Sequence, residues 1–191
     1  MSTVGSAGPL AARVLGAGLG AVRIREIPPD LLWLSIEPQH VRTAAEALVR
    51  RHGARFLISV GTDDRPLDGG FGVAHLFSLD AEHRFIALDC ALSESEPRID
   101  SITPVIPGAA WAEQEFRDLL GIEPVGHPDP RRLVLPDDWP DDAHPLRRDF
   151  AYNARPPAKL DFAPQLREPP EGSTVIPVGP FFPVLEEPAR L

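Results

Sequence analysis

Proline is distributed very unevenly along this chain, and its distribution limits what the second half can fold into. Of the 23 prolines in 191 residues, 15 lie after Leu120. Proline lacks a backbone N–H and clashes with the preceding helical turn, so this density excludes long helices and central strands. The sequence therefore predicts an extended arm over residues 122–191, behind a compact domain over residues 22–121. Residues 1–21, rich in Ala, Gly and Leu, are expected to form a flexible lead-in.

The compact part predicts a small α+β domain. Residues 38–52 have a strong helical period: Pro38 suits the first turn and Gly53 ends the helix. A second helix is expected over residues 109–120, ended by Gly121. Strands are expected at residues 22–27, 31–36, 56–60, 72–79, 84–91 and 98–103, with a turn-rich loop at 63–70. This order favours a small antiparallel or mixed sheet with helices on one face.

Composition excludes several classes of protein. The net charge of −9 argues against a nucleic-acid partner, because phosphate contacts require a basic surface. The single cysteine, Cys90, excludes a disulfide framework and a cysteine-ligated cluster built from this chain alone. No apolar run is long enough to span a bilayer.

The expected second helix combines apolar and acidic residues. Trp111, Glu115, Asp118 and Leu119 share one helical face, which predicts that Trp111 and Leu119 bury beside the two carboxylates. Glu113 precedes Arg117 by four residues, a spacing that favours an ion pair on a neighbouring face.

The arm carries arginine pairs among aspartates, and these charges are too weak to hold it. Fixing a residue costs about 1–2 kcal/mol, whereas a surface ion pair returns about 0–1 kcal/mol. Apolar side chains of the arm must therefore be buried, and we expect much of the surface that covers them to belong to a partner protein. These side chains are Leu133, Val134, Leu135, Trp139, Leu146, Phe150 and Phe162.

Residues 111–150 resemble a known family: the C subunit of respiratory NADH–quinone oxidoreductase (complex I) and the equivalent N-terminal domain or subunit of membrane-bound energy-conserving nickel–iron hydrogenases of the formate hydrogenlyase type. Gln114 and Leu120 depart from the family's usual Arg and Phe, and Arg148 replaces a Lys. The resemblance is carried by Trp111, Glu113–Glu115, Asp118–Gly121, Gly126–Asp129, Arg131–Arg132 and Pro145–Phe150.

The end of the chain carries a second resemblance. Residues 178–188 are similar to the opening strand of the large catalytic subunit of those hydrogenases, with Phe182 where a His is usual. The chain is accordingly either a separate subunit or the front part of a fused polypeptide.

The resemblance implies a subunit without a catalytic centre or cofactor of its own. Iron–sulfur clusters, and a nickel–iron centre or quinone, would belong to the large subunit and to neighbouring iron–sulfur subunits. The chain would clasp the large subunit as a peripheral protein on the cytoplasmic face of the inner membrane. The residues expected to contact the partner or hold the arm are Glu113, Glu115, Asp118, His127, Asp129, Arg131, Arg132, Trp139, Arg147, Arg148, Asp149 and Phe150.

Other functions stay open on the residues alone. Glu113, Glu115 and Asp118 could form an acid–base set, and Glu115 with Asp118 could serve a small soluble enzyme. His127 and Asp129 could bind a metal, although no cysteine lies nearby. The arginines could bind phosphate or quinone head groups, or the arm could serve a generic adaptor. We favour carboxylates that pair with the arginines of the arm.

Overall fold

The computed structural model describes residues 23–129, 131–154, 156–157, 169–174, 177–178 and 189–190. They fall into two compact units, Met1–Leu160 and Asp161–Leu191, so Gly121 lies inside the first unit. In the second unit, β8 (Pro177–Val178) pairs antiparallel with β9 (Ala189–Arg190). The expected lead-in, Phe162 and residues 179–188 lie outside the described part of the chain.

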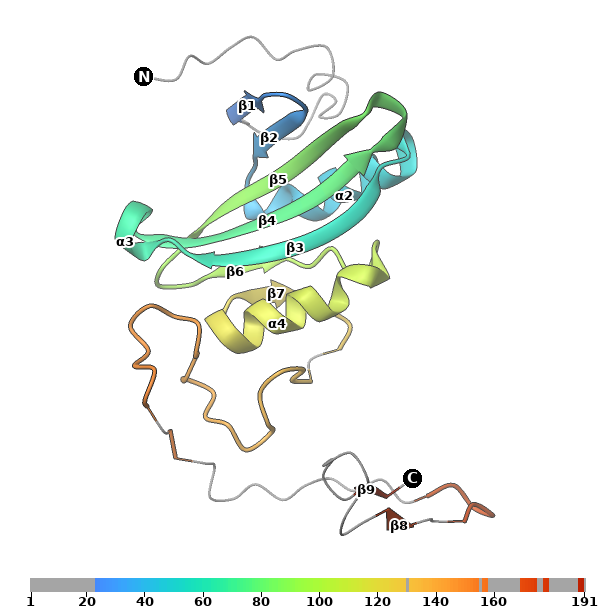
Figure 1. Ribbon diagram of the computed structural model, residues 1–191, viewed down its shortest axis with the longest axis vertical. Helices are drawn as coiled ribbons and strands as arrows, with labels where there is room; N and C mark the ends of the chain where they lie inside the picture. Colours follow the sequence, from blue (N-terminus) through green and yellow to red (C-terminus); the bar gives the residue numbers. More distant parts are fainter. Residues whose placement is uncertain are drawn as a thin grey trace. The chain divides into compact units, whose positions relative to one another are not determined.

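A five-stranded sheet forms the centre of the first unit (Figure 1). Its order is β1-β2-β5-β4-β3, and β2 runs parallel to β5 while the other neighbours are antiparallel. The prediction of an antiparallel or mixed sheet in an α+β domain is therefore confirmed as a mixed sheet. The strands are β1 (Arg23–Ile27), β2 (Leu31–Ser35), β3 (Arg55–Asp63), β4 (Gly70–Leu79) and β5 (Arg84–Ser93).

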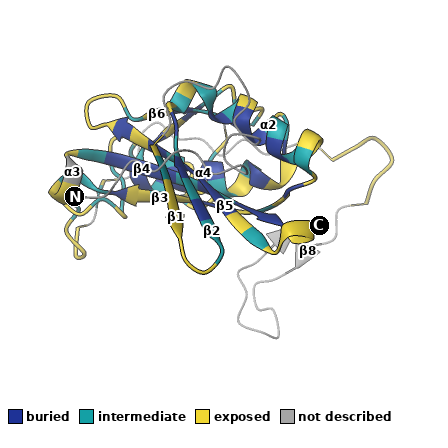
Figure 2. Cartoon of the chain, turned by 90° about the horizontal axis from the view of Figure 1, so that it is seen from above, coloured by how far each residue is buried: buried dark blue, intermediate teal, exposed yellow. Residues whose placement is uncertain are grey.

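Two helices pack against the same side of this sheet. Helix α2 (Val41–His52), preceded by the 3-10 turn η1 (Pro38–His40), buries Val41, Ala44, Ala45 and Leu48. Helix α4 (Ala110–Leu120), preceded by η3 (Pro107–Ala109), crosses β3 at Gly61, where an added Cβ would lie 2.7 Å from Phe116 Cβ. Gly61 pairs with the buried Val73, and buried residues of the sheet and of both helices belong to one core cluster. Figure 2 colours the buried parts of the strands and helices dark blue.

Three elements differ from the expected ones. The loop after β3 contains a short helix, α3 (Arg65–Asp68), and the β4–β5 turn contains η2 (Asp80–Glu82). Strand β6 (Arg98–Asp100) pairs in parallel with β7 (Glu123–Val125), which lies in the predicted arm. The sequence did not predict β7 because Pro124 lies in it, and a proline is tolerated in a strand only where its missing N–H is not needed. Within the described residues, no helix is long and apolar enough to cross a membrane.

Candidate functional site

Helix α4 buries a different face from the one predicted. Phe116 and Leu120 face the core, whereas Trp111 is 74% exposed and Glu115 is exposed as well. Leu119 is only half-buried. The predicted burial of Trp111 was wrong because two polar residues take buried positions instead: Glu113 and Asp118 find hydrogen-bond donors in hydroxyls and backbone N–H groups of the chain. Satisfied carboxylates can occupy buried positions that periodicity alone assigns to apolar residues.

The Glu113 carboxylate is fully buried and binds the segment that follows β6. It accepts hydrogen bonds from Ile102 N–H at 2.7 Å, Thr103 Oγ1 at 2.7 Å and Ser101 Oγ. The expected ion pair between Glu113 and Arg117 is therefore wrong. A buried carboxylate with three donors fixes the backbone of this segment relative to α4.

His127 holds the turn where the arm leaves β7. Its Nδ1 lies 3.0 Å from Asp129 N and 2.7 Å from Asp129 O, and its Nε2 lies 3.2 Å from Ala110 O. Nε2 is also 3.9 Å from Glu113 Oε2. Both ring nitrogens therefore contact atoms of the protein. Among the described residues, no group of three or more His, Cys, Asp or Glu could hold a metal ion.

Asp118 fastens the middle of the arm to α4. Its Oδ2 accepts the backbone N–H groups of Leu133, Val134 and Leu135 at 2.9, 3.0 and 3.3 Å. Its backbone carbonyl lies 2.9 Å from His144 Nδ1, while Arg117 Nη2 is 3.9 Å from Oδ1. Three converging N–H groups stabilise a buried anion in the way that a backbone nest does. The expected partner of this carboxylate, an arginine of the arm, is thus replaced by backbone.

Gln114 and Arg117 hold the segment before that contact. Gln114 Nε2 donates to the carbonyls of Asp129 and Arg131 at 3.3 and 3.2 Å, and Arg117 donates to Arg131 O as well. The Arg131 side chain bonds Asp129 at 2.9 and 2.7 Å, which holds the pKa of that carboxyl well below its usual range. Gln114, a departure from the family pattern, therefore binds arm carbonyls that an amide N–H can reach.

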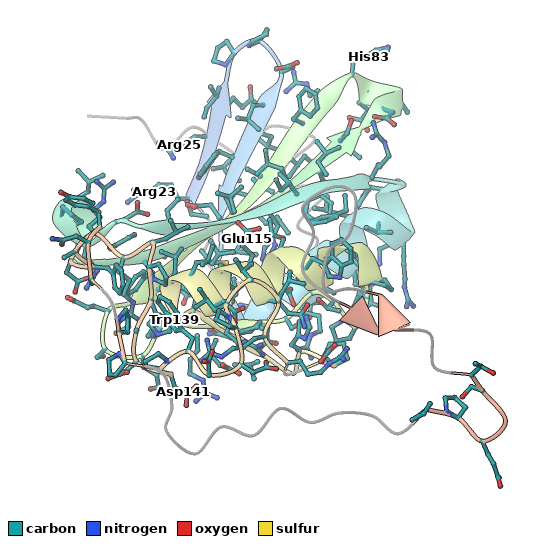
Figure 3. All side chains as sticks on the ribbon, turned by 60° about the horizontal axis from the view of Figure 1, so that its bottom comes forward. Arg23, Arg25, His83, Glu115, Trp139 and Asp141 are labelled. Carbon is teal, nitrogen blue, oxygen red and sulfur yellow. The ribbon has the colours of Figure 1, made fainter. Side chains whose placement is uncertain are left out.

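Arg132 and Trp139 close a turn within the arm. Arg132 Nη2 donates to Asp141 Oδ1 at 2.7 Å and to Trp139 O at 3.2 Å. The Trp139 indole N–H donates to Ala143 O at 2.7 Å, and its ring lies 6.4 Å from that of Phe150. Figure 3 labels Trp139 and Asp141 on this turn. These contacts give the proline-rich segment a defined path.

At residues 147–149 the arm comes back to the domain and contacts the loop after β3. Arg148 N–H donates to Asp63 Oδ2 at 2.8 Å, and Arg65 bridges Asp63 and Asp149 at 2.6 and 2.7 Å. The Arg65 guanidinium holds the pKa of Asp63 well below its usual range. Arg147 Nε donates to Leu120 O at 2.7 Å, at the C-terminus of α4. We call all these contacts between residues 127–150, α4 and the 63–71 loop the arm-anchoring site.

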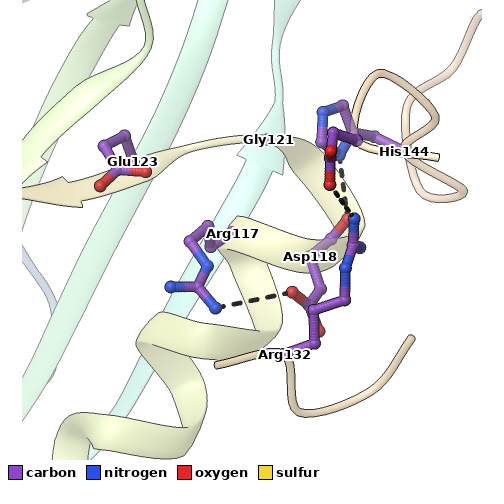
Figure 4. Close-up of a pocket in the computed structure, with 7 residues that line it drawn as sticks. Arg117, Asp118, Gly121, Glu123, Arg132 and His144 are labelled. Atoms are coloured by element: carbon purple, nitrogen blue, oxygen red, sulfur yellow. Dashed lines mark hydrogen bonds and ion pairs between the residues drawn. The ribbon is translucent and has the colours of Figure 1, made fainter. Parts of the chain in front are cut away.

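An open pocket of about 450 Å³ lies where the arm passes the end of α4 (Figure 4). Arg117 and Arg132 flank Asp118 there, and burial lowers the pKa of His144. The pocket mixes acidic and basic groups, so it favours neither an anion nor a cation. Its lining residues are Arg117, Asp118, Gly121, Glu123, Arg132, Asp141 and His144.

The two carboxylates considered for catalysis, Glu115 and Asp118, have different surroundings. Asp118 Oδ2 is occupied by three donors, and Glu115 has no hydrogen bond or ion pair with another described residue. The sequence reasoning missed Asp63 and Arg65, although an Asp-Asp-Arg step directly after a strand signalled an ordered charged loop. It also missed Ser101, Thr103 and His144, because hydroxyls and a histidine among prolines carry no spacing signal.

Comparisons with known proteins give a consistent picture. Residues 34–156 match the family model described as "Respiratory-chain NADH dehydrogenase, 30 Kd subunit". Hydrogenase-4 component G of Escherichia coli (strain K12) is 36% identical over 166 residues, 85% of this chain and 30% of that protein. The C subunit of NADH-quinone oxidoreductase from Azorhizobium caulinodans is 38% identical over 145 residues, 74% of this chain and 67% of that protein.

A solved structure shares the fold. A chain of the membrane-bound sulfane sulfur reductase, an archaeal respiratory membrane complex, superposes with a TM-score of 0.65 at 14% identity, covering 75% of this chain and 85% of that chain. The match covers 30% of the length of Hydrogenase-4 component G, so this chain spans less than a third of that protein.

Proposed function

This chain belongs to the family of the respiratory-chain NADH dehydrogenase 30 kDa subunit, and from that membership we propose that it is an accessory subunit of a complex I-like or hydrogenase-like membrane oxidoreductase. Its work is to bind the large catalytic subunit through the arm. The proposal places it as a peripheral protein on the cytoplasmic face of the membrane. Iron–sulfur clusters, with a nickel–iron centre or quinone, belong in this proposal to partner subunits.

One observation carries the proposal: the arm's backbone is bound to its own domain while several of its apolar side chains stay in water. Asp118 holds the amides of Leu133 and Val134, yet these side chains are 42% and 50% exposed. Leu146 is 58% exposed, although its N–H donates to Leu119 O at 3.0 Å. A backbone fixed in this way presents its apolar side chains outward without a further ordering cost, which favours binding.

The carboxylates of α4 support the same assignment over an enzymatic one. Glu113 and Asp118 each accept three hydrogen bonds from this chain, so both carboxylates have a structural role. Glu115, on the exposed side of α4 with Trp111, is available to a partner. Trp is among the residues that most often anchor protein interfaces.

The test is co-purification from native membranes. An affinity-tagged chain should retain the large subunit, identified by mass spectrometry, and Leu133→Asp with Val134→Asp should reduce its recovery at least about tenfold. Thr43→Asp is the control, because Thr43 is exposed on α2, outside the arm and the arm-anchoring site. Equal recovery of the large subunit with the arm variant and with the wild type would contradict the proposal that the arm binds it.

A further inference from the structure

The side of the sheet that faces away from α2 and α4 carries exposed apolar side chains along its β3 edge. Residues paired by strand register share one side of a sheet. Ile58 and Val60, on the edge strand β3, are 50% and 41% exposed on this side. One row across all five strands consists of Arg25, Trp33, Ala87, Leu76 and Ile58, and the next consists of Arg23, Ser35, Asp89, Ala74 and Val60.

The opposite edge strand, β1, carries a basic rim on the same side of the sheet. Arg23 and Arg25 are both exposed, and neither forms an ion pair with another described residue (Figure 3). The Arg25 guanidinium lies 5.6 Å from the centre of the Trp33 ring. Asp89, the carboxylate within these two rows, accepts a hydrogen bond from Ser35 Oγ at 3.2 Å and is half-buried, two strands away from Arg23. Asp64 and Asp80, which accept hydrogen bonds from Thr62 and Ser78, lie towards β3 and β4. The rim is therefore positive in a chain whose net charge is −9.

We propose that this sheet face binds an amphipathic helix of a partner protein, with an apolar stripe over Ile58, Val60 and Leu76 and carboxylates that pair with Arg23 and Arg25. A sheet with helices on one side completes a further layer when a helix covers its other apolar side. Exposed apolar area of this kind marks interaction surfaces, and the unpaired arginines select an acidic edge.

This inference rests on the proposed function in one respect: both require that the chain is assembled with other proteins. It uses the sheet face opposite α4, so the arm is not part of it. The two contacts can therefore fail separately, and one experiment with two attachment points distinguishes them.

The experiment places a photo-crosslinking benzoylphenylalanine at Val60, at Leu133 or at Thr43, an exposed position on α2, in the chain within its native membranes. Irradiation at Val60 should yield a crosslinked partner peptide, identified by mass spectrometry, with apolar residues at helical spacing and Asp or Glu beside them. Thr43 should yield no such product. A Leu133 crosslink without a Val60 crosslink would overturn this inference alone, and the absence of both would also contradict the arm proposal.

A charge variant tests the rim. Arg23→Glu with Arg25→Glu should lower the Val60 crosslink at least about fivefold, and Arg23→Lys with Arg25→Lys should keep most of it. The Leu133 crosslink serves as the internal standard and should not change. A Val60 product that joins residues 1–22 or a second copy of this chain would overturn the proposal, as would a yield insensitive to charge reversal.

Discussion

Arg65 Nη2 lies 2.7 Å from Asp149 Oδ1 and 2.6 Å from Asp63 Oδ2, so one guanidinium joins the end of β3 to the end of the arm. Its side chain is 16% exposed and also lies 5.0 Å over the Phe71 ring. The contact links residues 84 positions apart in the chain. This contact holds the arm at Asp149 against the end of β3.

Replacing Arg65 should weaken the attachment of the arm at Asp149 to the end of β3. Arg65→Met removes the partner of the buried Asp63 carboxylate, and we expect the free energy of unfolding to fall by about 2 kcal/mol. Asp149→Asn removes only the exposed half of the bridge and should cost less than about 1 kcal/mol. Urea unfolding of both variants measures the difference. Equal losses would mean that the Asp63 contact does not carry the stability.

The same bridge should make stability depend on acid. Hydrogen bonding to Arg65 lowers the pKa of Asp63 in the folded chain, whereas an unfolded Asp titrates near about 3.9. The bridge's contribution is therefore complete above that unfolded value and is lost as the pH falls below it. The free energy of unfolding, measured from pH 6 down to pH 2.5, should drop less steeply in Arg65→Met than in the wild type. Parallel curves for the two proteins would contradict this linkage.

Replacing Asp118 should increase the motion of the arm at residues 133–135 and leave the core unchanged. Asp118→Asn keeps the shape but replaces the anion with a neutral carbonyl and two donors, which cannot serve three amides equally. We expect hydrogen exchange of the Leu133, Val134 and Leu135 amides to accelerate at least about tenfold, since about 1.4 kcal/mol of protection is a factor of ten. Asp137→Asn, at an exposed position of the same arm, is the control. Unchanged exchange at residues 133–135 would show that another contact holds the arm.

The parts of this fold that followed from the sequence are those decided by local apolar periodicity. The helix at 38–52 and the hairpin around residues 80–83 were predicted almost to their ends, because Gly53 and the turn residues bound strong patterns. β7 was missed because Pro124 reads as a break, and its pairing with β6 connects distant parts of the chain.

The site was harder to predict than the fold, for a physical reason. Glu113 and Asp118 are buried because backbone N–H groups and hydroxyls from 10 to 17 residues away converge on them. That convergence is a property of the folded chain and leaves no spacing signal in the sequence. The resemblance to a family identified which carboxylates matter, but their partners became visible only in three dimensions.

Glu113 and Glu115 form a matched pair two positions apart on α4. Glu113→Gln should cost about 2–3 kcal/mol, because a buried amide cannot accept three hydrogen bonds as the carboxylate does. Glu115→Gln, at an exposed position, should change the free energy of unfolding by less than about 0.5 kcal/mol. Thermal unfolding of the isolated chain distinguishes the two. A stability loss in Glu115→Gln as large as that in Glu113→Gln would contradict the burial pattern of α4.

His75 predicts a second pH dependence, in a higher range. The side chain is completely buried, with Nδ1 2.7 Å from Ser59 Oγ and no partner for Nε2 among the described residues. Burial lowers the pKa of His75 from 6.5 to about 4, so between these values the unfolded chain binds a proton that the folded chain does not. Stability should therefore fall as the pH drops from 6.5 towards 4, by at most about 1.4 kcal/mol per pH unit. Ser59→Ala with His75→Phe removes the titrating group and the hydroxyl together, and its stability should be nearly flat over that range. Chemical unfolding of the two proteins at pH 7, 5.5 and 4.5 measures this, and an equally steep loss in the double variant would assign the dependence to other groups.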